Sequence, residues 1–207
     1  DGETTFCDGI QIVRKLSPET AKALASIRLR YKLAASKRDC QFWLGTENPD
    51  DLALQNPPDH CPYEFSRERN QICRSHTTPA LHKPMFSNKL TFANFLLFAR
   101  YMRQDRNFPS LEDGAAVPDR LVEEVKQVSD GLTYTHRWQK GDMLMLDNTR
   151  FMHGRNAVRD TAERYILTFF GYLKFARPPH NEPKEAPWRT PGGMRELTLE
   201  ANGAMPR

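Results

Sequence analysis

The chain has 207 residues, of which 39% are hydrophobic and 27% charged, a composition typical of one globular domain with a sizeable core. Its formal net charge of +4 is small and scattered, and Lys/Arg runs with interleaved aromatic residues are absent, so we expect no nucleic-acid binding. Because the sequence has neither a run of about eighteen apolar residues nor a charged-then-apolar leader, we expect no membrane span and a cytoplasmic protein.

The four cysteines predict neither a zinc site nor a disulfide framework. Cys7, Cys40, Cys61 and Cys73 have wide spacings and form no C-x-x-C pair. We therefore expect reduced thiols.

The first half of the chain predicts short helices and strands. Ser17 followed by Pro18 is typical of a helix start with Ser17 as the N-cap, and the helix should reach Leu24. Residues 27–33 alternate apolar and basic side chains, which predicts a half-buried strand. A further short helix is expected over 48–54, a surface loop over 56–62 and another strand over 71–78.

The second half begins with a long apolar segment. Residues 90–104 predict a strand to Asn94 and then a helix, although one helix throughout is an alternative. Apolar residues near helical spacing predict a helix over 119–128. Beyond Arg177 the chain is rich in proline, so we divide it into a domain over 1–176 and a Pro/Gly-rich C-terminal arm over 177–207.

The stretch from Trp138 to Phe170 is the most informative part of the sequence. Gly141-Asp142 predicts a turn, residues 143–146 a short strand that Asp147-Asn148 ends, and His153 the beginning of a polar loop. Residues 164–170 are rich in aromatic and β-branched side chains and predict the returning strand of an antiparallel pair. With Arg164 pointing inward, period-two alternation would also turn Ile166, Thr168 and Phe170 inward.

The chemistry of these residue types allows two readings. A neutral imidazole is a good ligand for Fe(II), and a guanidinium can fork onto the far carboxylate of a dicarboxylic co-substrate. Taken alone, however, a histidine near a strand end is more often a hydrogen-bonded structural residue, and an arginine at a strand start is usually a solvated charge. The residues by themselves leave both readings open.

The pattern W-x-x-G-D-x-x-x-x-D-N-x-x-x-x-H-G-R, with an arginine eleven residues after the histidine, resembles the C-terminal signature of the taurine dioxygenase/clavaminate synthase (TauD/TfdA) superfamily. Its members are Fe(II)- and 2-oxoglutarate-dependent oxygenases. The resemblance implies that His153 is the distal iron ligand and that Arg164 holds the distal carboxylate of 2-oxoglutarate.

Two further segments extend this resemblance to about Ala176. Residues 1–6 resemble the family's G-G-E-T segment, whose threonine, here Thr4, contacts the co-substrate. Residues 108–119 resemble the D-G-x-x-I-P-x-E stretch that leads into the helix before the metal strand. The implied cofactors are Fe(II) and 2-oxoglutarate.

The family's other two iron ligands lie in an H-x-D or H-x-E motif that precedes the G-G-E-T segment. We therefore expect them upstream of Asp1 and interpret the chain as the C-terminal part of a longer oxygenase. His180-Asn181-Glu182 has the right residue types, but prolines on both sides favour an irregular tail over a ligand pair.

The implied fold is mixed α/β, mainly β: a double-stranded β-helix, or jelly roll, with decorating helices and without its N-terminal part. The implied partners are O₂ and a small-molecule substrate, either free or tethered to a carrier protein. Arg155 and Thr168 are candidates for substrate contact, although Arg155 is equally expected as a surface residue. His76, His82 and His136 have no ligand partners at useful spacing and are expected to be structural or surface residues.

The expected reaction is hydroxylation of an amino acid or an amino-acid-derived natural-product intermediate, similar to the syringomycin-type aspartyl hydroxylases. Desaturation, cyclisation and halogenation share this half of the scaffold. Two alternatives remain: a non-catalytic jelly-roll binding module that lacks the H-x-D/E ligands, and a cupin-type enzyme without 2-oxoglutarate that would not need Arg164.

Overall fold

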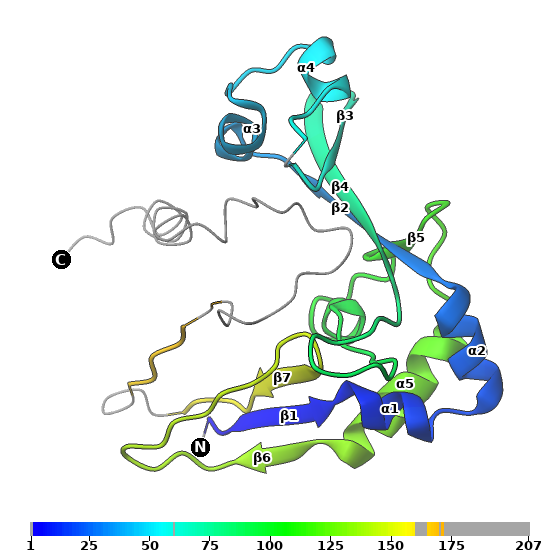
Figure 1. The fold of residues 1–207 in the computed structure, drawn as a ribbon, viewed down its shortest axis with the longest axis vertical. Helices are drawn as coiled ribbons and strands as arrows, with labels where there is room; N and C mark the ends of the chain where they lie inside the picture. The colour runs from blue at the N-terminus through cyan, green and yellow to red at the C-terminus, as the bar shows by residue number, and fades with distance from the viewer. Residues whose placement is uncertain (1, 60, 160–164, 170, 172–207) are drawn as a thin grey trace. The chain divides into compact units, whose positions relative to one another are not determined.

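The computed structural model describes residues 2–59, 61–159, 165–169 and 171 (Figure 1). The described residues fall into two compact units, one formed by those up to Lys32 together with those between Thr77 and Thr168, and the other by those between Leu33 and His76 together with Phe169 and Gly171. The described elements, in chain order, are β1 (Thr4–Asp8), α1 (Gly9–Lys15), α2 (Pro18–Ser26), β2 (Arg28–Ala34), α3 (Lys37–Leu44), α4 (Asp51–Gln55), β3 (Glu64–Glu68), β4 (Gln71–Pro79), the π-helix η1 (Phe98–Met102), β5 (Ser110–Leu111), α5 (Asp119–Leu132), β6 (Tyr134–His136) and β7 (Phe151–Arg155). Helices and antiparallel strands together confirm the mixed α/β class.

The first unit contains a three-stranded antiparallel sheet with β1 in the middle, between β6 and β7 (Figure 1). The β1 sequence TTFCD suits a strand because threonine and phenylalanine fit a pleated, half-buried surface. Cys7 and Met152 pair across β1 and β7, and both pack against the hydrophobic core. Since successive side chains point to opposite faces, Phe6 and His153, also a pair, lie on the other face.

The core of this unit lies between the sheet and helices α1, α2 and α5. Helix α5 contributes Leu121, Val122 and Val125, each at most 2% exposed, which confirms the predicted amphipathic helix and extends it to Leu132. Burying one such side chain stabilises the fold by ~1.5–3 kcal/mol. The cluster also includes Ile12, Leu16, Leu24, Leu29, Ala80, Leu81, Phe92, Leu96 and Val117.

The start of α2 is as predicted. The Ser17 hydroxyl accepts a hydrogen bond from the Thr20 N–H, and Pro18 is the first helical residue. Glu124 on α5 accepts hydrogen bonds from the Ser17 N–H at 2.5 Å and from the Thr20 hydroxyl at 2.5 Å. These bonds connect α2 to α5 and hold the pKa of Glu124 below its usual value, chiefly through the Thr20 hydroxyl.

The predicted strand over 27–33 is confirmed as β2. Within the first unit it pairs with β5, Leu29 opposite Leu111 and Arg30 opposite Ser110. Leu29 is fully buried, and the Tyr31 ring meets Phe108 edge-on at 5.6 Å. Burial raises the pKa of Tyr31.

The prediction of a strand over 90–94 is wrong. Only Thr91 bridges, to His82, and the helical residues that follow lead into the π-helix η1. Asn94 gives the physical reason: its side chain accepts from the Leu96 N–H and donates to the Ala80 carbonyl, which starts a helical turn in place of an extended chain.

The second unit contains a β-hairpin and two short helices. Strands β3 and β4 pair from Glu64–Ser75 to Glu68–Gln71, and β4 confirms the strand predicted over 71–78. Helix α4 confirms the helix predicted over 48–54, with Asp50 as its N-cap. Helix α3 was not predicted, although Ser36 and Asp39 form a capping box at its start.

An aromatic cluster lies inside this second unit. The Tyr63 ring meets Trp43 edge-on at 5.1 Å and has the Arg74 guanidinium at 4.8 Å from its centroid. Burial, and then the charge of Arg74, lower the pKa of the neighbouring His76. His76 is therefore a structural residue, as predicted.

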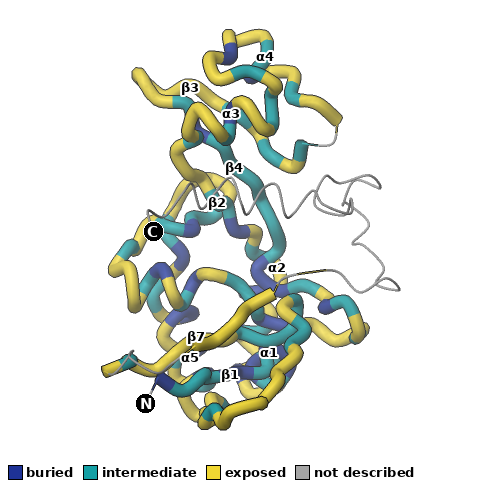
Figure 2. Tube along the Cα trace, turned by 90° about the vertical axis from the view of Figure 1, so that its left-hand side faces the viewer, coloured by how far each residue is buried: buried dark blue, intermediate teal, exposed yellow. Residues whose placement is uncertain are grey.

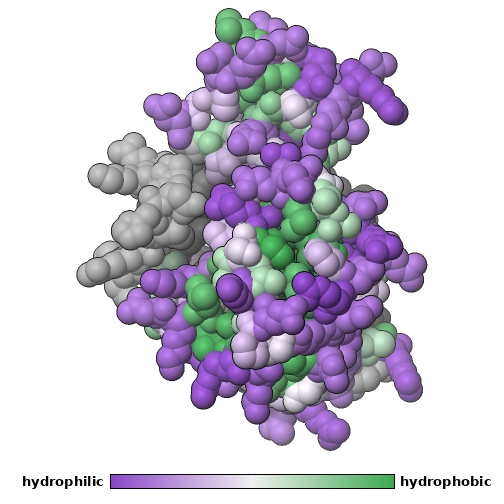
Figure 3. Space-filling view, turned by 90° about the vertical axis from the view of Figure 1, so that its right-hand side faces the viewer, coloured by the Kyte–Doolittle hydropathy of each residue, from purple (hydrophilic) through white to green (hydrophobic). Residues whose placement is uncertain are grey.

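The surface agrees with the charged composition of the sequence. Figure 3 shows a face on which hydrophilic side chains cover most of the area and hydrophobic side chains gather in several separate places. Among the described residues, no helix combines the length and the apolar character that crossing a bilayer requires. All four cysteines are free thiols, and burial raises the pKa values of Cys7, Cys40 and Cys61.

Candidate functional site

Thr4 and His153 are brought together by the register of the three-stranded sheet. Thr4 on β1 pairs with Arg155 on β7, and Phe6 pairs with His153. Paired residues of an antiparallel ladder point to the same face, and so do residues two apart on one strand. Thr4, His153 and Arg155 therefore share the face that lies opposite the core.

His153 lies in the middle of a strand and not, as predicted, at the start of a loop. Strand β7 is more exposed than β1 beside it (Figure 2). The His153 residue is exposed, and within the described part of the chain its ring makes no hydrogen bond. An imidazole with both nitrogens open is available for a ligand or a metal ion.

Gly154 explains why the H-G-R segment can follow β1 closely. A Cβ added at Gly154 would lie 3.0 Å from the Thr5 hydroxyl oxygen, a tighter contact than most side chains make. The glycine thus fits β7 against β1 next to His153.

Residues 147–150, Asp-Asn-Thr-Arg, form a turn before β7, and this turn is bound to the end of β1. The Asp147 carbonyl accepts hydrogen bonds from the N–H groups of Arg150 and Phe151, each at 3.0 Å. The Arg150 guanidinium then donates to both Asp8 oxygens, Nε to Oδ1 at 2.9 Å and Nη2 to Oδ2 at 2.5 Å. These two bonds are the main reason that the pKa of Asp8 is held below its usual value.

Asp8 also starts helix α1, since its side chain accepts from the Ile10 N–H at 3.0 Å. Gly9, which follows it, packs directly on backbone: an added Cβ would lie 2.3 Å from the Phe92 carbonyl oxygen and 2.8 Å from that of Arg150. The end of β1 and the start of β7 are therefore held together by close backbone contact and by one bidentate ion pair.

The sequence did not predict the contact between Trp138 and Thr4, or the contacts that His136, Gln139 and Asp142 make in the turn around Trp138. The Trp138 indole N–H donates to the Thr4 hydroxyl oxygen at 2.7 Å. The Trp138 ring meets His136 edge-on at 4.9 Å, and His136 Nε2 lies 2.9 Å from Asp142 Oδ2. The Gln139 N–H donates to that same oxygen at 2.9 Å, which closes the turn. The W-x-x-G-D letters were the available signal for this arrangement.

The two strands predicted on either side of His153, over residues 143–146 and 164–170, are not found beside it in the described chain. Residues 143–146 form no strand, and Met143 and Met145 are 93% and 81% exposed. Arg164 lies outside the described residues. Residues 165–169 are described and also form no strand; Ile166 and Thr168 are exposed, so the predicted inward alternation is wrong for both. The apolar content of these segments favoured strands, but no strand pairing is found for them among the described residues.

His82 is structural, as predicted. Its Nε2 lies 2.7 Å from the Thr149 carbonyl oxygen, which can only accept, so this nitrogen bears the proton. In the described part of the chain, no three His, Cys, Asp or Glu side chains are grouped so that they could hold a metal ion. His153 is thus the one predicted metal ligand that the described residues supply.

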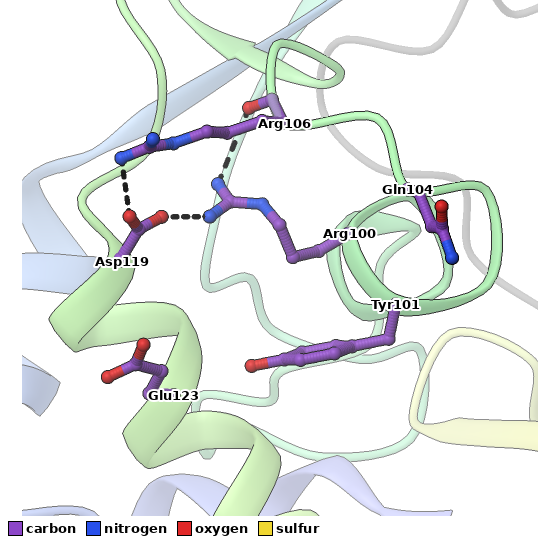
Figure 4. Close-up of a pocket in the computed structure, with 6 residues that line it drawn as sticks. All are labelled: Arg100, Tyr101, Gln104, Arg106, Asp119 and Glu123. Carbon is purple, nitrogen blue, oxygen red and sulfur yellow. Dashed lines mark hydrogen bonds and ion pairs between the residues drawn. The ribbon is translucent and has the colours of Figure 1, made fainter.

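A cavity of about 280 Å³ lies elsewhere in the first unit, between η1 and α5 (Figure 4). Asp119, at the start of α5, accepts hydrogen bonds from Arg100 and Arg106. Arg100, whose side chain is 12% exposed, also donates to the Val117 carbonyl at 3.0 Å. Both carboxylate oxygens are occupied by guanidinium groups, so this network joins η1 to α5 and is structural.

Comparison with known proteins finds one matching family and several similar proteins. Residues 1–169 match the sequence profile of the family described as taurine catabolism dioxygenase TauD, TfdA family. The chain is 23% identical over 165 residues to 3-((Z)-2-isocyanoethenyl)-1H-indole synthase of Fischerella ambigua and 25% identical over 177 residues to pentalenolactone F synthase of Streptomyces arenae. Each match covers 80% of this chain and 50% of the relative, so the chain spans about half the length of these curated relatives.

Among solved structures, the chain resembles a Burkholderia xenovorans protein assigned as an alpha-ketoglutarate dependent 2,4-D dioxygenase. The match has a TM-score of 0.42 and 18% identity, and it covers 79% of this chain and 54% of that one.

Proposed function

The chain belongs to the taurine catabolism dioxygenase TauD, TfdA family, and from this membership we propose that it serves an Fe(II)- and 2-oxoglutarate-dependent oxygenase that oxidises a C–H bond of a small molecule. The observation that supports the proposal most directly is the shared face of Thr4 and His153. A hydroxyl and an imidazole with open nitrogens stand there on adjacent strands.

In this proposal His153 binds the iron, while Thr4 and Arg164 hold the carboxylate end of 2-oxoglutarate. The described residues supply one suitable iron ligand, His153. Its exposed ring makes no competing hydrogen bond within the described chain. Bound Fe(II) and 2-oxoglutarate would together supply the activation of O₂ for oxidation of an unactivated C–H bond. The two remaining ligands are expected from an H-x-D/E motif outside these residues.

Residues of this chain hold His153 in a fixed position beside Thr4. Asp8 and Arg150 fix the turn before β7, and Gly154 lets β7 lie close against β1. The position of His153 along β7 relative to Thr4 on β1 is therefore set by backbone pairing. A ligand on a paired strand is held more rigidly than one on a loop. The antiparallel sheets of the described residues agree with a jelly roll, the fold that we propose for the complete domain.

We propose a small organic substrate, free or bound to a carrier protein, with hydroxylation as the reaction. Both curated relatives are named as synthases of defined small compounds, which supports this substrate class. Arg155 is exposed on the same face as His153 and is the better placed of the two candidate substrate contacts, since Thr168 is exposed in a segment without strand structure.

The second candidate function is a non-catalytic module that binds a small carboxylate. It is favoured only by the absence of a three-residue metal cluster in the described part of the chain. The two candidates differ in one property, since the module would bind 2-oxoglutarate without any dependence on iron.

Anaerobic titration of the full-length protein with Fe(II) and then 2-oxoglutarate tests the proposal. We expect an absorption band from the iron/2-oxoglutarate complex that His153→Ala abolishes. His180→Ala is the matched control, because His180 heads the other H-x-E pattern of the sequence. A band that persists in His153→Ala, or that disappears in His180→Ala alone, would remove His153 from the iron site. Iron-independent binding of 2-oxoglutarate would favour the non-catalytic module.

A further inference from the structure

Trp138 occupies one hydrogen-bonding position of the Thr4 hydroxyl group. Its indole Nε1–H donates to Thr4 Oγ1 at 2.7 Å, and both residues are half-buried. An indole N–H can only donate, so the Thr4 oxygen must act as the acceptor in this bond.

This bond leaves the Thr4 proton available for a ligand. A hydroxyl group has one proton to donate and two lone pairs that accept. Among the described residues, no acceptor receives the Thr4 hydroxyl proton. With one lone pair directed at Trp138, rotation of the hydroxyl is restricted and its proton points away from the indole.

The Trp138 ring is itself held in place. It meets the His136 ring edge-on, with 4.9 Å between centroids and an interplanar angle of 89°. His136 Nε2 is bonded to Asp142 Oδ2 at 2.9 Å, and the Gln139 N–H donates to the same oxygen. The turn after β6 therefore fixes the indole against β1.

We infer that Trp138 is a positioning residue that presents the Thr4 hydroxyl as a hydrogen-bond donor to the distal carboxylate of 2-oxoglutarate. The inference rests on the proposed function, in which Thr4 contacts that carboxylate. A carboxylate is an acceptor only, so it needs the donor orientation that the indole imposes. Trp138 touches neither the co-substrate nor the iron in this arrangement and acts through Thr4.

The test is the equilibrium affinity for 2-oxoglutarate, measured by calorimetry on the full-length protein under anaerobic conditions with Fe(II). Trp138→Phe removes the N–H and keeps a ring beside His136, and we expect it to weaken binding about fivefold. Thr4→Val should weaken binding about tenfold, and the double variant should be no weaker than Thr4→Val alone, because the indole acts only through the hydroxyl. Thr4→Ser keeps the hydroxyl and should retain the sensitivity to Trp138→Phe.

Two controls separate positioning from general damage. Trp43→Phe, in the other unit of the chain, should leave the affinity unchanged. The second ligand is 2-oxobutanoate, which lacks the distal carboxylate; its affinity should not respond to Trp138→Phe. Thermal unfolding of each variant shows whether it is folded.

Each result has a definite meaning. Losses from Trp138→Phe and Thr4→Val that add in the double variant, an equal loss for 2-oxobutanoate, or full affinity in Trp138→Phe would overturn the inference while leaving the proposed function intact. If the unsubstituted protein does not bind 2-oxoglutarate, the proposed function fails and the inference with it. If Thr4→Val alone has no effect, Thr4 is not a carboxylate donor, and the role of Trp138 is refuted together with it.

Discussion

Thr4 and His153 are diagonal neighbours on one face of an antiparallel sheet, because Thr4 pairs with Arg155 and His153 precedes Arg155 by two residues. Diagonal neighbours of this kind are about 7–8 Å apart. In the proposed function, this spacing would let a short oxo acid held at His153 reach the Thr4 hydroxyl. The segments that supply these two side chains are more than a hundred residues apart in sequence, and the backbone ladder alone sets their separation.

The ion pair between Asp8 and Arg150 predicts a pH-dependent stability. Asp8 has a lowered pKa, so its contribution is fully present above the unfolded value of about 3.9 and is lost as the pH falls through the folded value. We expect Asp8→Asn, which keeps an N-cap acceptor for α1, to lower the free energy of unfolding by about 1–3 kcal/mol at pH 7. Urea unfolding at a series of pH values measures this.

The difference between the Asp8→Asn variant and the unsubstituted protein should begin to shrink as the pH falls below the unfolded value of about 3.9, and it should be lost as the pH falls through the lowered folded pKa of Asp8. A difference that stays constant from pH 7 to pH 3 would contradict the assigned role of the charge.

Substitution by alanine is expected to have opposite effects on stability at Gly9 and at Gly131. Gly9→Ala places a methyl group 2.3 Å from the Phe92 carbonyl oxygen, so we expect destabilisation by about 3 kcal/mol or more. Gly131 lies in α5 with nothing within 4 Å of an added Cβ, and Gly131→Ala should stabilise by about 0.5–1 kcal/mol. Thermal unfolding of the two variants measures both, and equal effects would argue against the close packing at Gly9.

Asp119 is expected to stabilise the junction of η1 and α5. Asp119→Asn removes the charge that Arg100 and Arg106 share, and because Arg100 is mostly buried we expect a loss of about 2–4 kcal/mol. Asp130→Asn is the matched control, since its partner Lys126 is one helical turn away on the surface and the loss should be about 0.5 kcal/mol or less. Similar losses in chemical denaturation would show that Asp119 is no more than a surface partner.

Arg164→Ala should weaken 2-oxoglutarate binding by about tenfold or more while leaving iron affinity nearly unchanged. The reason is that, in the proposed function, the Arg164 guanidinium makes a bidentate hydrogen bond to the distal carboxylate of 2-oxoglutarate, and Arg164→Ala removes it. Arg120→Ala, which breaks an exposed pair with Glu19, is the control and should change neither affinity. Unchanged co-substrate affinity in Arg164→Ala would remove Arg164 from the site and favour an enzyme that does not use 2-oxoglutarate.

The local signals in the sequence determined several elements correctly. The Ser17-Pro18 start of α2, the alternation of β2 and the apolar spacing of α5 depend on residues close together in the chain, and the structure confirms all three. Family membership followed from the W-x-x-G-D and H-G-R letters and is confirmed over residues 1–169. The roles of Thr4, His153 and Arg164 stay predictions.

The tertiary structure decided where the residues of the site stand. His153 was expected in a loop because the letters after Asp147 are polar, yet β7 forms there because β1 offers it a full set of backbone partners. Residues 143–146 look more strand-like, but no partner strand is assigned to them in the described chain, and β propensity without pairing does not make a strand. The W-x-x-G-D pattern marks Trp138 in the sequence, but it does not give its contact with Thr4, because that hydrogen bond joins residues 134 positions apart, which only the folded sheet brings within 2.7 Å.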